Sequence, residues 1–171
     1  MHRYQYLYES DCAAVARLGK HKNSTSNTKQ TKTLARIIAL DIGKKRTGVA
    51  VTDPLQIIAT ALDTVDTGEL IGYLKKYMAS EPVEKVIVGY PLNLDDSPTH
   101  ATPIVEKFIL KFGNVFPDMP VVKTDERMTS KLASTEIAGM GLKKKDREQK
   151  ELIDAVSAVM MLQEYLEHRQ K

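Results

Sequence analysis

The sequence predicts an α/β protein built on a mixed five-stranded sheet with helices on both faces. Three β-branched-rich segments come first and lie close together, which is typical of antiparallel strands joined by short connections. Two shorter apolar segments follow, each after a stretch whose apolar residues have helical spacing. Alternating helix and strand units add parallel strands to a sheet, and their helices cover its faces.

The first three strands are expected at residues 36–41, 47–52 and 57–65. Residues 43–46 contain a glycine and three basic residues, which indicates the turn of a hairpin between the first two strands. The third segment has an Ala-rich middle and a weaker strand pattern. Together these segments predict the antiparallel part of the sheet.

Helices and strands alternate in the rest of the chain. We expect a helix at 69–78, a strand at 85–88, a helix at 103–112 that ends at Gly113, and a strand at 121–124. Thr129 or Ser130 can cap a further helix that ends at Gly139 and Gly141, and the last helix begins near Lys150.

The chain divides into a basic N-terminal extension, residues 1–34, and one domain, residues 35–171. Residues 21–33 contain no apolar side chain, so we interpret them as a disordered linker. The extension carries six basic and two acidic residues, whereas the remaining 137 residues carry 19 and 20. The net charge of +3 therefore resides in the extension, and nucleic-acid binding by the domain would depend on local basic patches.

The composition excludes several classes of protein. Its 42% hydrophobic and 27% charged residues are typical of a soluble globular domain, and no apolar run approaches the roughly 20 residues that span a bilayer. Residues 1–18 contain two acids and lack the apolar core of a secretory signal. Cys12 is the only cysteine, which excludes an internal disulfide and a zinc-type cysteine cluster. We expect a cytoplasmic protein without a membrane segment.

Acidic residues end two of the predicted strands. Asp41 ends the first strand, and Asp125 with Glu126 follows the strand at 121–124. Functional residues of such sheets collect at the carboxyl ends of strands. Each acid also has a structural interpretation, Asp41 as a turn former and the acid pair as exposed loop residues bound to Arg127.

Asp154 lies in the most apolar segment of the chain. Residues 152–162 read LIDAVSAVMML, in which Asp154 and Ser157 are the only polar residues. A helix that is apolar on almost all sides is buried, and a buried carboxylate needs a cation, a hydrogen-bond donor or a proton. A structural partner such as Arg127 would satisfy Asp154. A metal would also satisfy it, because carboxylates from two strand ends and a helix suit Mg²⁺ or Mn²⁺, and two such ions can drive phosphodiester hydrolysis.

Two basic clusters flank these acids in the sequence, one in the predicted hairpin turn and one before the last helix. A run of charge is usually a solvated face, but closeness to the acids makes both clusters candidates for phosphate binding. The candidate substrate-binding residues are Lys44, Lys45, Arg46, Arg127, Lys143, Lys144 and Lys145. Tyr and Phe residues are scattered, so the sequence does not indicate a base-stacking platform.

Four segments resemble the YqgF/RuvX family of pre-16S rRNA nucleases, which are related to Holliday junction resolvases. The segments are ALDIGKKRTGVAVTD at 39–53, VIVGYPLNLDDS at 86–97, DERMTS at 125–130 and LIDAVSAVMMLQEYL at 152–166. The resemblance implies an RNase H-like fold for residues 35–166. It also implies that the catalytic and metal-binding carboxylates are Asp41, Glu126 and Asp154, with Mg²⁺ or Mn²⁺ as the cofactor.

Details of these motifs refine the expectation. The Glu of the DER motif is the family's acid, so Glu126 ranks above Asp125. Gly89-Tyr90-Pro91 resembles the family's loop beside the site, with Tyr90 where Leu is common. Asp96 stands where the family commonly has Gly, which argues against a tight glycine-type turn at that position.

The resemblance implies a nuclease that matures the 5′ end of 16S rRNA, with nucleic acid as its partner. A Holliday junction resolvase and a non-catalytic nucleic-acid-binding module of the same fold remain alternatives, because fold alone does not define the substrate. A sugar-kinase or actin-like ATPase shares the loop pattern of residues 41–51 but needs two such domains. A monomer and a homodimer are both compatible with these activities.

Overall fold

The computed structural model describes residues 34–93, 95–125 and 150–169. Most of the N-terminal extension, Glu126, Arg127, the helix expected after Ser130 and the second basic cluster lie outside these residues. The described elements are β1 (Arg36–Ile42), β2 (Arg46–Thr52), β3 (Ala59–Asp66), α1 (Leu70–Ser80), β4 (Val83–Tyr90), α2 (Thr102–Val115), β5 (Val121–Asp125) and α5 (Lys150–Arg169).

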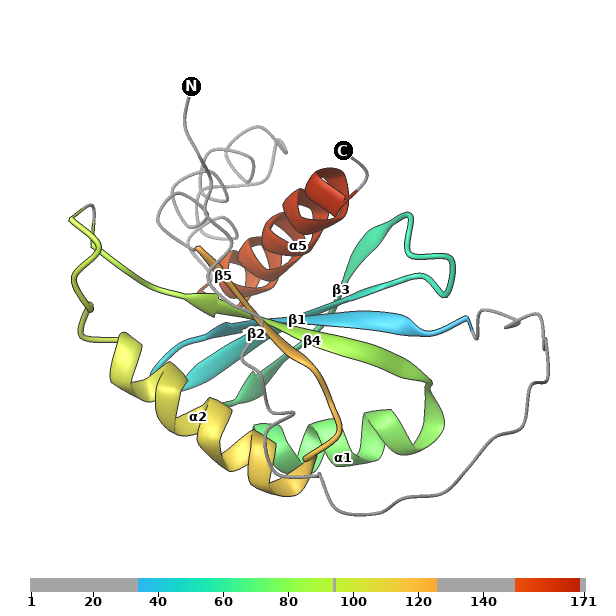
Figure 1. Ribbon diagram of the computed structural model, residues 1–171, viewed down its shortest axis with the longest axis horizontal. Coiled ribbons are helices and arrows are strands. Elements are labelled where there is room, and N and C mark those ends of the chain that lie inside the picture. The colour runs from blue at the N-terminus through green and yellow to red at the C-terminus, as the bar shows by residue number, and fades with distance from the viewer. Residues whose placement is uncertain (1–33, 94, 126–149, 170–171) are drawn as a thin grey trace, which may run out of the picture.

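The five strands form one mixed sheet in the order β3-β2-β1-β4-β5. β1 pairs with β2, and β2 with β3, in antiparallel register. β4 and β5 add in parallel on the other side of β1. The predicted fold class is confirmed, with three antiparallel strands followed by parallel ones. Figure 1 shows α5 on one face of this sheet and α1 with α2 on the other.

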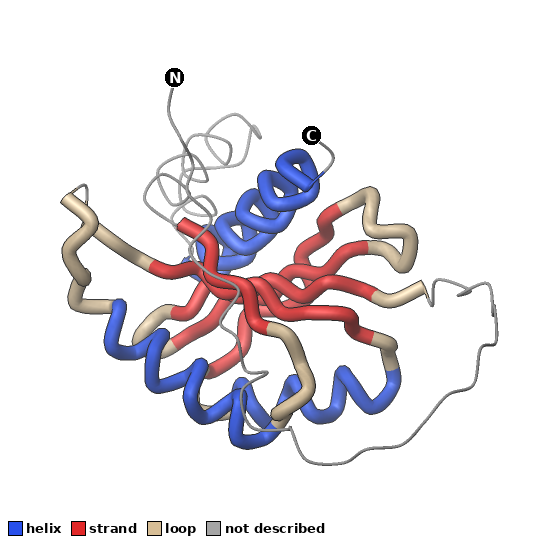
Figure 2. Tube along the Cα trace, in the orientation of Figure 1, coloured by secondary structure: helices blue, strands red, loops and turns tan. Residues whose placement is uncertain are grey.

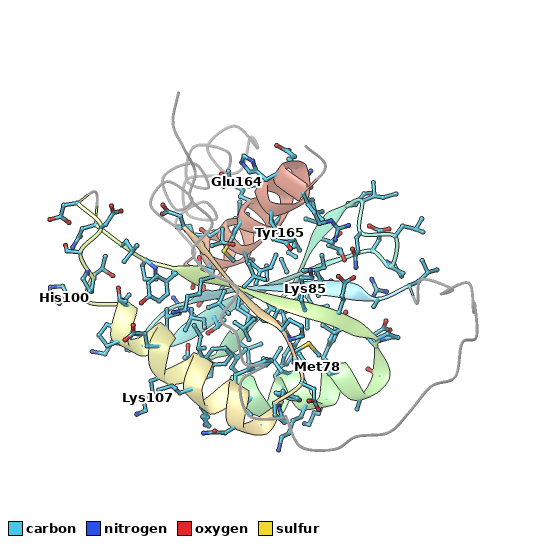
Figure 3. All side chains as sticks on the ribbon, viewed as in Figure 1. Met78, Lys85, His100, Lys107, Glu164 and Tyr165 are labelled. Atoms are coloured by element: carbon cyan, nitrogen blue, oxygen red, sulfur yellow. The ribbon has the colours of Figure 1, made fainter. Side chains whose placement is uncertain are left out.

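Strand alternation creates a separate hydrophobic core on each face. On β1, Ile38 and Leu40 belong to the core beneath α1 and α2, whereas Ile37 and Ala39 belong to the core beneath α5. Met78 of α1 and Tyr165 of α5 pack against these two cores, and Figure 3 labels them on opposite sides of the sheet. β1 is therefore covered on both faces, as the continuous burial of residues 37–40 requires.

α2 continues beyond Gly113, so the predicted helix end at that glycine is wrong. The helix runs to Val115, and the Phe116 N–H donates to the Phe112 carbonyl at 2.8 Å. The Phe112 and Phe116 rings lie 4.8 Å apart between centroids. Gly113 alone is a weak stop signal, because the apolar face of the helix continues for one more turn.

A tight turn does form at Asp96, contrary to the expectation from its missing glycine. Asp96 has φ 64°, and its N–H donates to the Asn93 carbonyl at 3.0 Å. Asp is among the few residues other than glycine that tolerate this left-handed conformation. Asp95 completes the loop by accepting bonds from Ser97, which lower the pKa of Asp95. Two adjacent aspartates thus form a tight turn without a glycine.

Asp53, the last residue of the first family-like segment, has a structural role in the turn between β2 and β3. Its carboxylate accepts the backbone N–H groups of Leu55, Ile57 and Ile58 at 2.7 to 2.9 Å. These bonds, chiefly the ones from Ile58 and Ile57, lower the pKa of Asp53. The tube in Figure 2 shows this connection as a loop leading into β3. In the described part of the chain no helix has the length and apolar character to cross a membrane.

Candidate active site

A row of residues crosses the α5 face of the sheet at the point where β1 ends. The antiparallel registers place Thr64 of β3 opposite Gly48 of β2, and Gly48 opposite Asp41 of β1. The parallel register Leu40↔Val88, continued by one residue, brings Asp41 beside Gly89, and Gly89 pairs with Thr124. We call Thr64, Gly48, Asp41, Gly89 and Thr124 the site row.

Asp41 shares the α5 face with Ile37 and Ala39, because alternate residues of a strand point to the same side. Asp154 reaches this row from the first turns of α5, where the helix packs across β2, β3 and β1. Burial, and next the Asp41 carboxylate, raise the pKa of Asp154 above its ordinary value. The structure therefore brings together two of the three predicted acids, which are separated by more than a hundred positions in the sequence.

Arg46 forms ion pairs with two acids of α5, Glu151 and Asp154. Its Nη1 lies 2.7 Å from Oε1 of Glu151, and its Nε lies 3.5 Å from Oδ2 of Asp154. The second distance is an ion pair rather than a hydrogen bond, and Nε has no hydrogen-bond acceptor among the described residues. Arg46 opposes the rise in the pKa of Asp154 without cancelling it. The structural partner of Asp154 is thus Arg46 of the hairpin.

Asp125 lies on the other face of the sheet. On β5, Val122 packs in the core beneath α5 and Val121 in the core beneath α1 and α2. The Lys123 ammonium lies 4.4 Å from the centroid of the Tyr90 ring, which also packs on the α1 and α2 side. Alternation therefore turns Thr124 to the face of Asp41 and turns Asp125 away from it.

The predicted basic residues are only partly brought to the site. Lys44 and Lys45 are exposed at the tip of the hairpin that connects β1 to β2, next to the site row. Arg46 lies at the site but is engaged by the two acids of α5. Arg127, Lys143, Lys144 and Lys145 lie outside the described residues, as does Glu126.

The donors at the row suit a hard divalent cation. Asp41 and Asp154 supply carboxylate oxygens, and the hydroxyl of Thr124 is buried without a hydrogen-bond partner within the described ranges. A buried hydroxyl without a partner is costly, and a bound ion or its water would satisfy it. No cluster of three or more His, Cys, Asp or Glu residues that could hold a metal ion occurs in the parts of the chain that are described.

Sequence reasoning missed three residues of this region. Glu151 holds Arg46, and its backbone carbonyl accepts the Thr64 hydroxyl at 3.1 Å. Gly48 lies under the backbone of Asp154, and Thr124 completes the row. Glu151 could have been found as an acid one helical turn before Asp154, but the roles of Gly48 and Thr124 depend on register, which the sequence pattern does not supply.

Comparisons with known proteins cover the whole domain. The family profile described as "RuvX: Holliday junction resolvase" matches residues 35–168. A "Putative pre-16S rRNA nuclease" of Flavobacterium psychrophilum is 48% identical over 133 residues, which is 78% of this chain and 97% of that protein. A protein of the same name from Bacteroides thetaiotaomicron is 45% identical over 80% of this chain and 99% of its own length.

Among solved structures, Thermus thermophilus RuvC in complex with a Holliday junction substrate is similar with a TM-score of 0.49 and 19% identity. The match covers 80% of this chain and 96% of that one.

Proposed function

The chain belongs to the RuvX family, and from this premise we propose that it is a metal-dependent nuclease that hydrolyses phosphodiester bonds of precursor 16S rRNA at its 5′ end. The observation that carries the proposal is that Asp41 and Asp154 lie on one face of the sheet, where the Asp41 carboxylate helps to raise the pKa of Asp154. Acids that repel each other in a half-buried position are costly unless a cation joins them.

Asp41 and Asp154 would hold the divalent ions through their carboxylate oxygens, and Mg²⁺ or Mn²⁺ fits this donor set. Two ions held in this way supply an activated water and stabilise the leaving oxygen of the phosphodiester. Asp41 is the next-to-last residue of β1, a strand that is covered on both faces, so the sheet fixes its position. Asp154 is fixed by α5, which lies across the same strands.

The third carboxylate in this proposal is Glu126. Strand alternation turns Asp125 to the α1 and α2 face, away from Asp41. This placement of Asp125 and the DER motif both favour Glu126 over Asp125. A domain of residues 35–171 would then contain the complete site, with residues 1–34 as a basic extension.

Lys44 and Lys45 would bind phosphates of the nucleic-acid strand, because they are exposed at the hairpin beside Asp41. Arg46 would add positive charge within the site itself. Arg127, Lys143, Lys144 and Lys145 complete the proposed phosphate-binding set. We place the activity in the cytoplasm, where precursor rRNA is processed.

Precursor 16S rRNA is the favoured substrate because the curated relatives with more than 40% identity are named for it. Branched DNA is the second candidate, since the family profile is described as a Holliday junction resolvase. The test offers the purified chain both substrates side by side, in Mg²⁺ and in EDTA. We expect Mg²⁺-dependent cleavage of the rRNA precursor near its mature 5′ end.

Substitution of the proposed metal-binding carboxylates tests whether cleavage occurs at this site. Asp41→Asn, Glu126→Gln and Asp154→Asn should each reduce cleavage by about a hundredfold or more, because a neutral amide oxygen is a poorer ligand for a hard cation. Asp125→Asn is the matched control and should retain cleavage. Binding of both substrates without cleavage of either would identify a non-catalytic module, and loss of activity in Asp125→Asn rather than Glu126→Gln would move the third ligand to Asp125.

A further inference from the structure

Gly48 is the residue of the site row over which α5 crosses. A Cβ atom built on Gly48 would overlap the backbone carbonyl group of Asp154 and would lie 3.1 Å from the backbone nitrogen of Ala155. Backbone atoms of a helix interior cannot move aside as the end of a flexible side chain can. No residue other than glycine therefore fits at position 48 with α5 in its present place.

The close approach occurs at the position that matters for the acids. Gly48 is the register partner of Asp41, so the backbone of Asp154 rests on the strand residue directly beside Asp41. Thr64, the next residue along the row, donates its hydroxyl to the carbonyl of Glu151 at 3.1 Å. The first turns of α5 thus contact two neighbouring residues of the site row, Gly48 and Thr64.

Small side chains also lie at the next contacts between β2 and α5. Ala50 follows Gly48 on the same face of β2 and is fully buried, and Ala158, one turn after Asp154, is fully buried in the same core. Two small residues on the strand and one on the helix allow the two backbones to lie close together over this stretch. At Gly72 and Gly113, by contrast, an added Cβ would meet nothing within 4 Å.

We propose that Gly48 is a positioning residue of the active site, which sets the depth of α5 on the sheet and thereby the separation between the Asp154 and Asp41 carboxylates. A ligand set for a divalent ion must be held to within about 0.5 Å of its working geometry. A methyl group at position 48 moves the helix by more than this, because overlap with a carbonyl group cannot be relieved by rotating a side chain. This inference deepens the proposed metal-dependent nuclease and rests on it.

The test compares Gly48→Ala with Gly72→Ala in the full-length chain. Mn²⁺ affinity is measured by electron paramagnetic resonance, and the position of α5 by crystallography. We expect Gly48→Ala to displace the first turns of α5 and weaken Mn²⁺ binding about tenfold or more, with Gly72→Ala unchanged in both. Unchanged Mn²⁺ affinity with α5 in its original place in Gly48→Ala would overturn the proposal.

A rescue variant separates positioning from a general loss of structure. Glutamate is one methylene longer than aspartate, so Asp154→Glu should partly restore Mn²⁺ binding in the Gly48→Ala background, where the helix backbone has moved outward. Failure of this rescue in a folded double variant would argue that position 48 acts on stability alone.

Asp154→Glu by itself keeps the test decisive if Gly48→Ala does not fold. With Gly48 holding the helix backbone in place, the longer side chain carries its carboxylate beyond the position of the Asp154 carboxylate. Mn²⁺ affinity should therefore fall about tenfold. Unchanged affinity would show that α5 adjusts freely, which overturns the proposal. A wild-type chain that binds no Mn²⁺ would instead overturn the proposed metal site, whereas the displacement of α5 in Gly48→Ala would still decide the role of Gly48.

Discussion

Replacing Asp154 with Asn should stabilise the metal-free protein and abolish its response to metal. Burial and the Asp41 charge raise the pKa of Asp154, so its ionised form is disfavoured in the folded state at neutral pH. Arg46 opposes this rise in the pKa without cancelling it, through an ion pair that spans 3.5 Å to an Asp154 side chain that is 31% exposed. Asn keeps the shape of the side chain and removes the charge.

The expected gain in the free energy of unfolding is about 1 kcal/mol in EDTA at pH 7, because relief of repulsion and desolvation exceeds the loss of a partly exposed ion pair. For a domain of this size, that corresponds to a rise in Tm of roughly 3 to 4 °C. Since the pKa is raised, the difference between variant and wild type should be largest above that pKa. It should fade as the pH falls through it toward the ordinary value near 4.

Thermal unfolding of both proteins in EDTA and in Mg²⁺ at several pH values measures these effects. Mg²⁺ should raise the Tm of the wild type and leave Asp154→Asn unchanged, because only the wild type retains the ligand. A variant that is less stable than the wild type in EDTA would refute the reasoning. Asp154 would then be one half of a structural ion pair with Arg46.

Three further predictions concern Thr124 of the site row, Asp53 of the turn between β2 and β3, and the N-terminal extension. Thr124→Val should leave the metal-free protein as stable as the wild type, or more stable by about 1 kcal/mol, because the buried Thr124 hydroxyl has no partner among the described residues. The same variant should reduce cleavage. Thr52→Val is the control and should lower stability by about 1 to 2 kcal/mol, since the Thr52 hydroxyl accepts the Ile37 N–H at 2.9 Å. Asp53→Ala should lower the Tm at pH 7 and have little effect at pH 2, because a lowered pKa contributes stability that is lost as the pH falls through it. Deleting residues 1–34 should leave the Tm within a few degrees of the full chain and weaken RNA binding mainly at low salt, as measured by filter binding across a salt series.

The sequence was sufficient to predict five strands and the division of the sheet into an antiparallel and a parallel part. A continuous apolar run predicts a strand that is buried on both faces, as in β1, and helical spacing of apolar residues predicts a helix with one buried face, as in α1. Element ends were less predictable, because they depend on contacts that are distant in sequence. α2 continues past Gly113 since Phe112 and Phe116 still pack together, and Asp96 supplies a turn that was expected to need glycine.

The candidate site was predictable in its chemistry but not in its geometry. Asp41 and Asp154 were identified from a strand end and an apolar helix, and both lie on one face of the sheet. The pairing of Arg46 with Glu151 and Asp154 depends on how α5 crosses β2, which no local pattern encodes. Which of Thr124 and Asp125 lies on the face of Asp41 likewise depends on the register of β5.

The most direct test of the account is an anomalous diffraction map of crystals of the full-length chain grown or soaked in MnCl₂. The account predicts Mn²⁺ peaks bound by the carboxylates of Asp41 and Asp154 on the α5 face of the sheet, with Glu126 completing the ligands and Asp125 outside them. Peaks absent from this face, with Arg46 still bound to Asp154 at saturating Mn²⁺, would contradict it.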